Sequence, residues 1–180
     1  MIRIREAEAA DLPAVTAIYD HHARTGTGTF EEAGPDLAEM TRRWEAVRAM
    51  ALPYRVAIGA DDQVLGFAYA SPFRARPAYR YLVEDSVYIA PGSEAQGLGR
   101  ALLEDLIRAC EAAGSRGLLA VIGDRANAAS IGLHTACGFV ETGTLPYAGF
   151  KFGRWVDVVL MHRPLNGGDR TPPEGPGWVR

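Results

Sequence analysis

One carboxylate in the sequence is well placed for acid–base chemistry because it lies in a stretch that is otherwise apolar enough to be buried. Glu84 belongs to residues 83–90, which predict a buried strand. Burial raises the pKa of a carboxyl group because the charged form loses its water, and a carboxylate that titrates near neutral pH suits a general base. The alternative is a structural ion pair, in which a buried cation balances the charge.

A glycine pair follows this strand where a helix is expected to begin. Gly97 and Gly99 precede a helical run that extends to Cys110. Glycine lets the backbone approach a ligand closely since it has no Cβ. The first turn of a helix also leaves N–H groups unpaired beside a partial positive charge. This junction therefore predicts a site for the pyrophosphate of a cofactor, with the chemistry on the preceding strand.

Several other motifs are excluded by what surrounds the glycines. No Lys-Ser/Thr pair follows them, as a nucleoside-triphosphate P-loop requires, and no third glycine completes the dinucleotide fingerprint. The sequence has no Gly-x-Ser-x-Gly element and no His or Cys cluster with the spacing of metal ligands, so no metal is expected. The adjacent His21 and His22 point to different faces of a helix, and we interpret them as a solvated helix end.

Other side chains could bind or act on a substrate. Arg74 and Arg76 are two residues apart, so in an extended segment both would project to one side and could bind a carboxylate or phosphinate. Two solvated surface charges are the plainer interpretation of this pair. His134 is a lone histidine on a helix, and such a residue is usually structural. Phe30 fits either a small extension of the core or a ligand-facing position.

The periodicity of the chain predicts the elements that position these residues. Strands are expected over residues 2–5, 54–58, 64–70, 83–90, 117–122, from 139, and over 155–161. Helices are expected from Asp11, over 36–50, from the glycine pair to Cys110, and from the cap Asn127 to His134. The early strands form hairpins, whereas the later alternation of strands and helices requires a right-handed parallel crossover. The prediction is an α/β or α+β sheet with helices on both faces.

Composition limits the kinds of partner. The 19 basic and 22 acidic residues argue against a nucleic-acid or membrane-surface protein. The first residues are too charged for a signal peptide, and no apolar run is long enough to span a membrane, so a cytoplasmic protein is expected. Cys110 and Cys137 are expected to be buried free thiols. Residues 1–165 form one domain in this interpretation, and the Gly- and Pro-rich residues 166–180 form a disordered tail.

The motifs are more specific in combination than alone. An apolar strand, Gly97-Leu-Gly99, Arg-Ala-Leu-Leu, another strand and Asn127-x-x-Ser are followed by a Gly-Phe pair that ends the next helix. This order resembles the GNAT superfamily of acetyl-CoA-dependent N-acetyltransferases, and within it the phosphinothricin and methionine sulfoximine acetyltransferases. The resemblance is carried by residues 69–79, 83–88, 121–123, 127–134, 143–145 and 149–157. It implies a GNAT-type mixed, largely antiparallel central sheet with a splayed parallel strand pair and helices on both faces.

Matched residue by residue, the resemblance assigns roles to this chain. Acetyl-CoA would be bound by Val87, Tyr88, Ile89, Ala95, Gln96, Gly97, Leu98, Gly99, Arg100 and Asn127. The acceptor would be bound by Phe30, Arg74, Ala75, Arg76, Tyr79, Glu84, Asp85 and Ser86. Glu84 would be the general base, and His134 stands where many superfamily members have a tyrosine as general acid. The backbone N–H of Val87 would hold the thioester carbonyl. Glu94 departs from the pattern, which usually has Gln or Arg there.

The resemblance implies transfer of acetyl from acetyl-CoA to the α-amine of a small amino-acid-like acid such as phosphinothricin or methionine sulfoximine. Relatives are usually dimers, so a homodimer is expected, with Lys151 and Trp155 as architectural or dimer-interface residues. A rival enzyme would acetylate protein N-termini or a polyamine, although a polyamine pocket would require acidic residues in place of Arg74 and Arg76. A non-catalytic CoA-binding regulatory domain is the second rival, and it predicts binding without thiol release.

Overall fold

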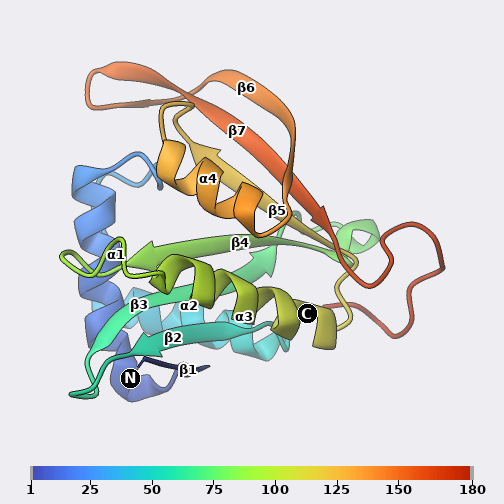
Figure 1. Ribbon diagram of the computed structural model, residues 1–180, viewed down its shortest axis with the longest axis horizontal. Coiled ribbons are helices and arrows are strands. Elements are labelled where there is room, and N and C mark those ends of the chain that lie inside the picture. Colours follow the sequence, from blue (N-terminus) through green and yellow to red (C-terminus); the bar gives the residue numbers. More distant parts are fainter. Residues whose placement is uncertain (1, 179–180) are drawn as a thin grey trace.

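The chain forms one mixed sheet with helices on both faces (Figure 1). The computed structural model describes residues 2–178, within which the sheet has seven strands in the order β1-β2-β3-β4-β5-β7-β6. The strands are β1 (Arg3–Glu6), β2 (Tyr54–Ile58), β3 (Val64–Pro72), β4 (Leu82–Ile89), β5 (Gly117–Gly123), β6 (Val140–Lys151) and β7 (Arg154–Pro164). The helices are α1 (Leu12–Thr25), α2 (Leu37–Ala49), α3 (Leu98–Ala112) and α4 (Ala128–Ala136), with short 3₁₀ turns η1 (Ala9–Asp11) and η2 (Pro77–Tyr79).

The strands and helices expected from the sequence are present, and the predicted crossover is confirmed because β4, α3 and β5 form it and β4 pairs with β5 in parallel. The other neighbouring strands pair antiparallel. One feature was not anticipated. The strand after α4 does not lie beside β5, because the last strand of the chain, β7, is inserted between β5 and β6. Hairpin formation by β6 and β7 leaves either strand free to join the sheet, and the sequence does not show which one does.

The sheet opens between its two parallel strands, which confirms the predicted splayed pair. Pairing of β4 with β5 runs from Leu82 opposite Gly117 to Asp85 opposite Ala120 and then stops. Beyond Asp85, β4 remains paired only with β3, and β5 remains paired with β7. The second half of β4 therefore has one free hydrogen-bonding edge in the middle of the sheet.

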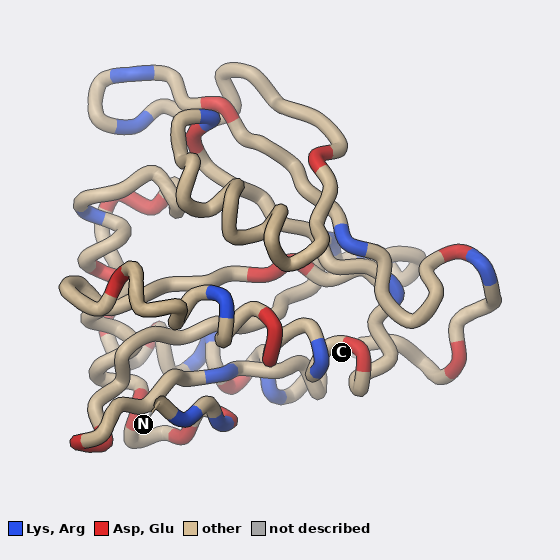
Figure 2. The backbone as a smooth tube through the Cα atoms, in the orientation of Figure 1, with Lys and Arg blue, Asp and Glu red and all other residues tan. Residues whose placement is uncertain are grey.

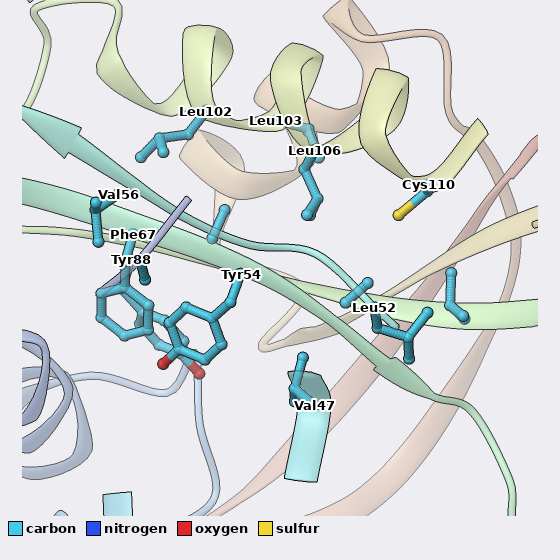
Figure 3. Packing of buried hydrophobic residues seen from close by; sticks show 14 of the residues in the cluster. Val47, Leu52, Tyr54, Val56, Phe67, Tyr88, Leu102, Leu103, Leu106 and Cys110 are labelled. Atoms are coloured by element: carbon cyan, nitrogen blue, oxygen red, sulfur yellow. The ribbon is translucent and has the colours of Figure 1, made fainter. Parts of the chain in front are cut away.

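The core has two distinct sides (Figure 3). On one side the rings of Tyr54, Phe67 and Tyr88 stack, with Tyr54 and Phe67 centroids 5.9 Å apart and Phe67 and Tyr88 centroids 5.1 Å apart. On the other side, buried residues of α3, including Leu102 and Leu106, cover the sheet. Residues directly opposite each other in a sheet share a face. The register therefore places Glu84, Ser86 and Tyr88 on the aromatic side, and Asp85, their neighbour along β4, on the α3 and α4 side.

The end of the chain differs from its prediction. The segment 166–178 packs on the domain instead of forming a disordered tail: Trp178 is only 7% exposed and its backbone N–H donates to the Arg80 carbonyl at 3.0 Å. The Arg116 guanidinium donates to the carbonyls of Gly168 and Thr171. The buried ring of Trp178 and the hydrogen bonds of Arg116 hold this segment in place. A prediction of disorder from average composition does not detect such single contacts. Residues 179–180 lie outside the described part.

Other bulk expectations can be compared with residues 2–178. Cys110 and Cys137 are both buried and free, as predicted. Basic and acidic residues are interspersed over the fold (Figure 2), consistent with the nearly balanced charge. Within that described part, the structure holds no helix with the length and hydropathy needed to cross a bilayer.

Candidate active site

A cleft of about 960 Å³ opens where β4 and β5 separate. Its walls come from residues 26–30, the second half of β4, the turn before α3, the end of β5 and the start of α4. The predicted site residues in its lining are Phe30, Glu84, Asp85, Ser86, Val87, Tyr88, Ile89, Ala95, Gly97, Leu98, Gly99, Arg100, Asn127 and His134. The predicted residues outside this lining are Gln96, Arg74, Ala75, Arg76 and Tyr79.

The turn before α3 leaves backbone N–H groups without a side-chain cap. Gly97 is the N-cap of α3 with φ 78°, a left-handed conformation that favours glycine, and it offers no side chain to cap the helix. The first-turn N–H groups are therefore open to a ligand, and the backbone of Ala101 is the first to bond back, to the Gly97 carbonyl. Gly99 allows α3 to pack closely against α4, because a Cβ there would lie 3.3 Å from Leu133 of α4.

The carboxylate of Glu94, whose charge would repel a diphosphate at this turn, is engaged in a local hydrogen bond. Its carboxylate accepts a hydrogen bond from the Gly92 backbone N–H at 2.7 Å, so it stabilises the turn locally. Arg100, which could offset the charge of Glu94, forms an ion pair with Glu104 one turn along the helix at 2.7 Å. Asn127 caps α4 as predicted, with its side-chain oxygen accepting from Ser130 N–H at 3.1 Å.

The free edge of β4 presents backbone groups only at alternate residues. The Ala90 N–H bonds to the Leu65 carbonyl, which identifies the residues of β4 whose N–H and C=O groups face β3. By alternation, Tyr88 uses its backbone in the pair with Phe67, whereas Val87 and Ile89 direct theirs toward the opening. Tyr88 therefore contributes a side chain, and the backbone pairing predicted for all three residues is available only at Val87 and Ile89.

One of these groups already has a partner. The His22 ring nitrogen Nε2 donates to the Ile89 carbonyl at 2.7 Å, and the His22 ring lies 5.4 Å from that of Tyr88. The interpretation of His22 as a solvated helix end is wrong, because the residue lines the cleft and braces the free edge of β4. Its partner is 67 residues away in the sequence, so no local pattern could have indicated the contact.

Glu84 has the acidity that a general base requires. Burial, reinforced by the charge of Asp85, raises the pKa of Glu84 to about 7. Neither cause is a cation, and within residues 2–178 no ion pair is formed by this carboxylate, which disfavours the structural alternative. Glu84 faces the side of the sheet that carries α1 and the loop of residues 26–30.

Asp85 and His134 form a buried pair on the opposite side. His134 Nε2 lies 2.9 Å from Asp85 Oδ2, and His134 Nδ1 lies 2.7 Å from the Ser130 carbonyl oxygen. A carbonyl only accepts, so Nδ1 carries a proton, and a second proton on Nε2 satisfies the carboxylate. Burial alone would lower the pKa of His134, but the hydrogen bond and charge of Asp85, with the Ser130 carbonyl, raise it. The raised pKa favours the imidazolium form of the ring.

These positions separate the two predicted catalytic residues. Glu84 opens to the cleft from the aromatic side, whereas His134 opens to it from the α3 and α4 side. A ligand that passes between β4 and β5 would meet both, one at each face. Asp85, predicted to bind the acceptor, is instead 6% exposed and engaged by His134.

The arginine loop does not adopt the extended form on which its prediction depended. Residues 73–76 bend and lead into η2, and the Arg74 guanidinium lies over the Phe73 ring, 5.1 Å from its centroid. Arg74 and Arg76 are exposed. Because η2 leads directly into β4, this loop lies at the amino end of that strand, near Glu84, and the α3 turn lies at the other end.

Comparison with known proteins agrees with this geometry. Residues 15–139 match the model of the acetyltransferase (GNAT) family. The chain belongs to the GNAT family. It is accordingly an N-acetyltransferase, a member of the acyltransferase class 2.3.1.

Relatives of this GNAT chain match it nearly end to end. It is 56% identical over 171 residues to a phosphinothricin N-acetyltransferase of Alcaligenes faecalis, covering 95% of this chain and 86% of the relative. An L-methionine sulfoximine/L-methionine sulfone acetyltransferase of Pseudomonas paraeruginosa is 39% identical, with 91% and 94% covered. A crystal structure of a phosphinothricin acetyltransferase from Sinorhizobium meliloti in complex with AcCoA superposes with a TM-score of 0.93 at 45% identity, covering 97% and 94%.

Proposed function

We propose that this GNAT enzyme transfers the acetyl group of acetyl-CoA to the α-amine of a small amino-acid-like acid, with phosphinothricin or methionine sulfoximine as acceptor. Glu84 carries the proposal, since a carboxylate with a pKa of about 7 lies where the central sheet opens. The relatives named for these two acceptors support the substrate class. Acetyl-CoA as the donor, two free cysteines and bacterial relatives fit a cytoplasmic enzyme.

The residues of the cleft fit acetyl-CoA at both of its ends. Acetyl-CoA supplies the activated acyl thioester. The uncapped first turn of α3, with Gly97 and the N–H groups that follow, would bind the diphosphate. The backbone of Val87 and the Ile89 N–H would pair with the pantetheine arm, since the Ile89 carbonyl already accepts from His22, and the Val87 N–H would hold the thioester carbonyl. Asn127 would contact the cofactor from the start of α4.

Glu84 and His134 divide the proton transfers between the two faces. Glu84 takes a proton from the acceptor ammonium, directly or through water, because only the neutral amine is nucleophilic. His134 supplies the proton that the departing thiolate needs. The Nε2 proton of His134 is donated in a hydrogen bond to Asp85. Transfer of this proton to the thiolate therefore requires the hydrogen bond to break. The pair thus holds the donor protonated until the thiolate forms.

The acceptor would bind on the Glu84 side. Phe30 and Ser86 line the cleft there, and the loop that carries Arg74, Arg76 and Tyr79 lies at the adjacent end of β4. Arginine is suited to the acidic end of the acceptor through paired hydrogen bonds. Since the loop lies outside the cleft lining, it would have to move toward Glu84 or be supplied by a second copy.

A CoA-release assay tests the proposal against its rivals. The panel contains phosphinothricin, methionine sulfoximine, ordinary amino acids, polyamines and peptides with N-terminal Ala or Ser. We expect thiol release with the first two acceptors in preference to the others. Release with polyamines or peptides alone would replace the substrate class, and acetyl-CoA binding without release for any amine would favour a regulatory domain.

We further propose that the chain is a homodimer. The β6–β7 hairpin carries six large apolar side chains that are each more than half exposed: Val140, Leu145, Tyr147, Phe150, Phe152 and Trp155. Such a concentration on one element marks a contact surface. A second copy that covers it would bury these rings. Light scattering should give a dimer mass for the wild type and a monomer for Trp155→Glu; a wild-type monomer at micromolar concentration would contradict this.

A further inference from the structure

Lys151 differs from the other basic residues of the chain in side-chain type and in burial. Of the 19 Lys and Arg residues, 18 are arginine and Lys151 is the only lysine. It lies at the end of β6 and is 3% exposed, whereas the ion-paired arginines lie at or near the surface. A buried cation requires a specific set of partners, since its desolvation is costly.

The partners of Lys151 are three backbone carbonyls, and all belong to one short segment. Nζ donates to Ala23, Gly26 and Thr29 at 2.6, 2.7 and 2.8 Å. Ala23 lies in the last turn of α1 and Gly26 is its C-cap, where carbonyls lack helical partners and carry partial negative charge. The three ammonium donors match three convergent oxygens, which the planar fork of arginine cannot do. Burial lowers the pKa of Lys151, although the charges of Glu32 and Glu31 oppose this.

The segment that Lys151 holds forms a wall of the cleft. Gly26, Thr27, Gly28, Thr29 and Phe30 all line it. The Thr27 carbonyl packs so closely on Gly123, and the Phe30 ring on Gly149, that a Cβ at either glycine would clash. Leu119 pairs with Glu84, and Gly123 lies four residues further along β5, so this wall is on the Glu84 side of the sheet.

We propose that Lys151 is a positioning residue for the acceptor: by tying residues 26–30 to β6, its ammonium sets the shape of the acceptor side of the cleft without contacting either substrate. This inference rests on the proposed function, which places the acceptor on the Glu84 side. The α3 turn, which would bind the cofactor diphosphate, belongs to other elements. Loss of Lys151 should therefore affect the two substrates unequally.

Residues 26–30 are also held by contacts that do not involve Lys151, so a Lys151 variant should loosen only the part of the segment next to β6. The Tyr19 hydroxyl lies 3.0 Å from the Thr29 hydroxyl and donates to Glu31 at 3.0 Å. Glu31 also pairs with Arg43 of α2 at 2.7 Å. These bonds hold the far side of the segment, whereas Lys151 alone holds the backbone of residues 23–29 to β6 among the hydrogen bonds of the described chain.

The test compares Lys151→Met and Lys151→Arg with the wild type, using phosphinothricin and acetyl-CoA. Arg108→Met on the exposed face of α3 is the control. Both Lys151 variants should raise the acceptor KM by about tenfold, the effect of losing roughly one hydrogen bond's worth of binding, and leave the acetyl-CoA KM within about twofold. Hydrogen exchange should accelerate at residues 26–30 and remain unchanged at 98–101.

Several outcomes would overturn the proposal. A folded Lys151→Met enzyme with a wild-type acceptor KM would refute it, as would an equal rise in both KM values. Wild-type behaviour of Lys151→Arg would show that charge alone suffices. If Lys151→Met does not fold, Gly149→Ala perturbs the same segment through Phe30 and must raise the acceptor KM selectively. If the wild type acetylates none of the panel, the proposed function fails, while the exchange data still decide whether Lys151 orders the segment.

Discussion

Replacing Glu84 with glutamine removes the titrating group and keeps the shape of the side chain. In the folded protein the pKa of Glu84 is about 7, against an ordinary value of 4.5, because of burial first and the Asp85 charge second. The folded state therefore binds this proton more tightly than the unfolded chain. Between pH 4.5 and 7 the unfolded chain releases it first, so wild-type stability falls as pH rises.

The size of this effect follows from the two pKa values. The difference corresponds to about 3 kcal/mol in free energy of unfolding, fully expressed above pH 7 and absent below pH 4.5. Glutamine carries no charge at any pH. The stability of Glu84→Gln relative to wild type should therefore improve by up to about 3 kcal/mol between pH 4.5 and pH 8.

Urea denaturation followed by tryptophan fluorescence at a series of pH values measures this difference. Glu45→Gln, at an exposed position of α2, is the matched control and should show no such trend. Turnover should fall about a hundredfold or more in Glu84→Gln, the usual effect of losing a general base, with acetyl-CoA affinity nearly unchanged. Wild-type kcat/KM should rise with a midpoint near pH 7, because that ratio reports the pKa of the free enzyme. A stability difference independent of pH, or wild-type turnover in the variant, would refute the reasoning.

Three other variants probe the rest of the site. Arg76→Ala should raise KM for acidic acceptors and leave simple amines unaffected; an equal effect on all amines excludes a carboxylate clamp. Asp85→Asn removes the partner that raises the pKa of His134, so the histidine pKa measured by NMR should fall. Stability should then drop by about 3 kcal/mol below pH 6, where the imidazolium contributes fully, with a smaller loss at higher pH; an unshifted histidine would contradict the pair. Gly97→Ala forces a side chain into a left-handed conformation at about 1 kcal/mol and should weaken acetyl-CoA binding several-fold by calorimetry, with unchanged affinity arguing against the α3 turn as the diphosphate site.

Local pattern was enough to locate much of the candidate site. The strand pattern around Glu84 predicted that this carboxylate would be partly buried, and the turn at Gly97 predicted an uncapped helix start; both depend on residues that are neighbours in sequence. Asn127 as the cap of α4 is another local feature. The resemblance then supplied the splayed strand pair, because the point at which β4 and β5 separate is not encoded by either strand alone.

The arginine loop shows where a local rule failed. Alternation in an extended segment placed Arg74 and Arg76 on one side, but Pro77 begins a 3₁₀ turn and the chain bends before it. The tail shows the same limit in the opposite direction, since Trp178 packs on a segment nearly a hundred residues earlier.

The sequence by itself determined which chemistry is available: a carboxylate in an apolar strand, a helix start open to phosphate, and the motif order of an acetyltransferase. Only the tertiary structure decided how those parts face one another. It put Glu84 and His134 on opposite sides of the opening, joined His134 to Asp85 across 49 residues, and tied Lys151 to three carbonyls more than 120 residues away. Such contacts arise from the packing of α1, α4 and β6 around the sheet, and the geometry of that packing is a property of the whole fold.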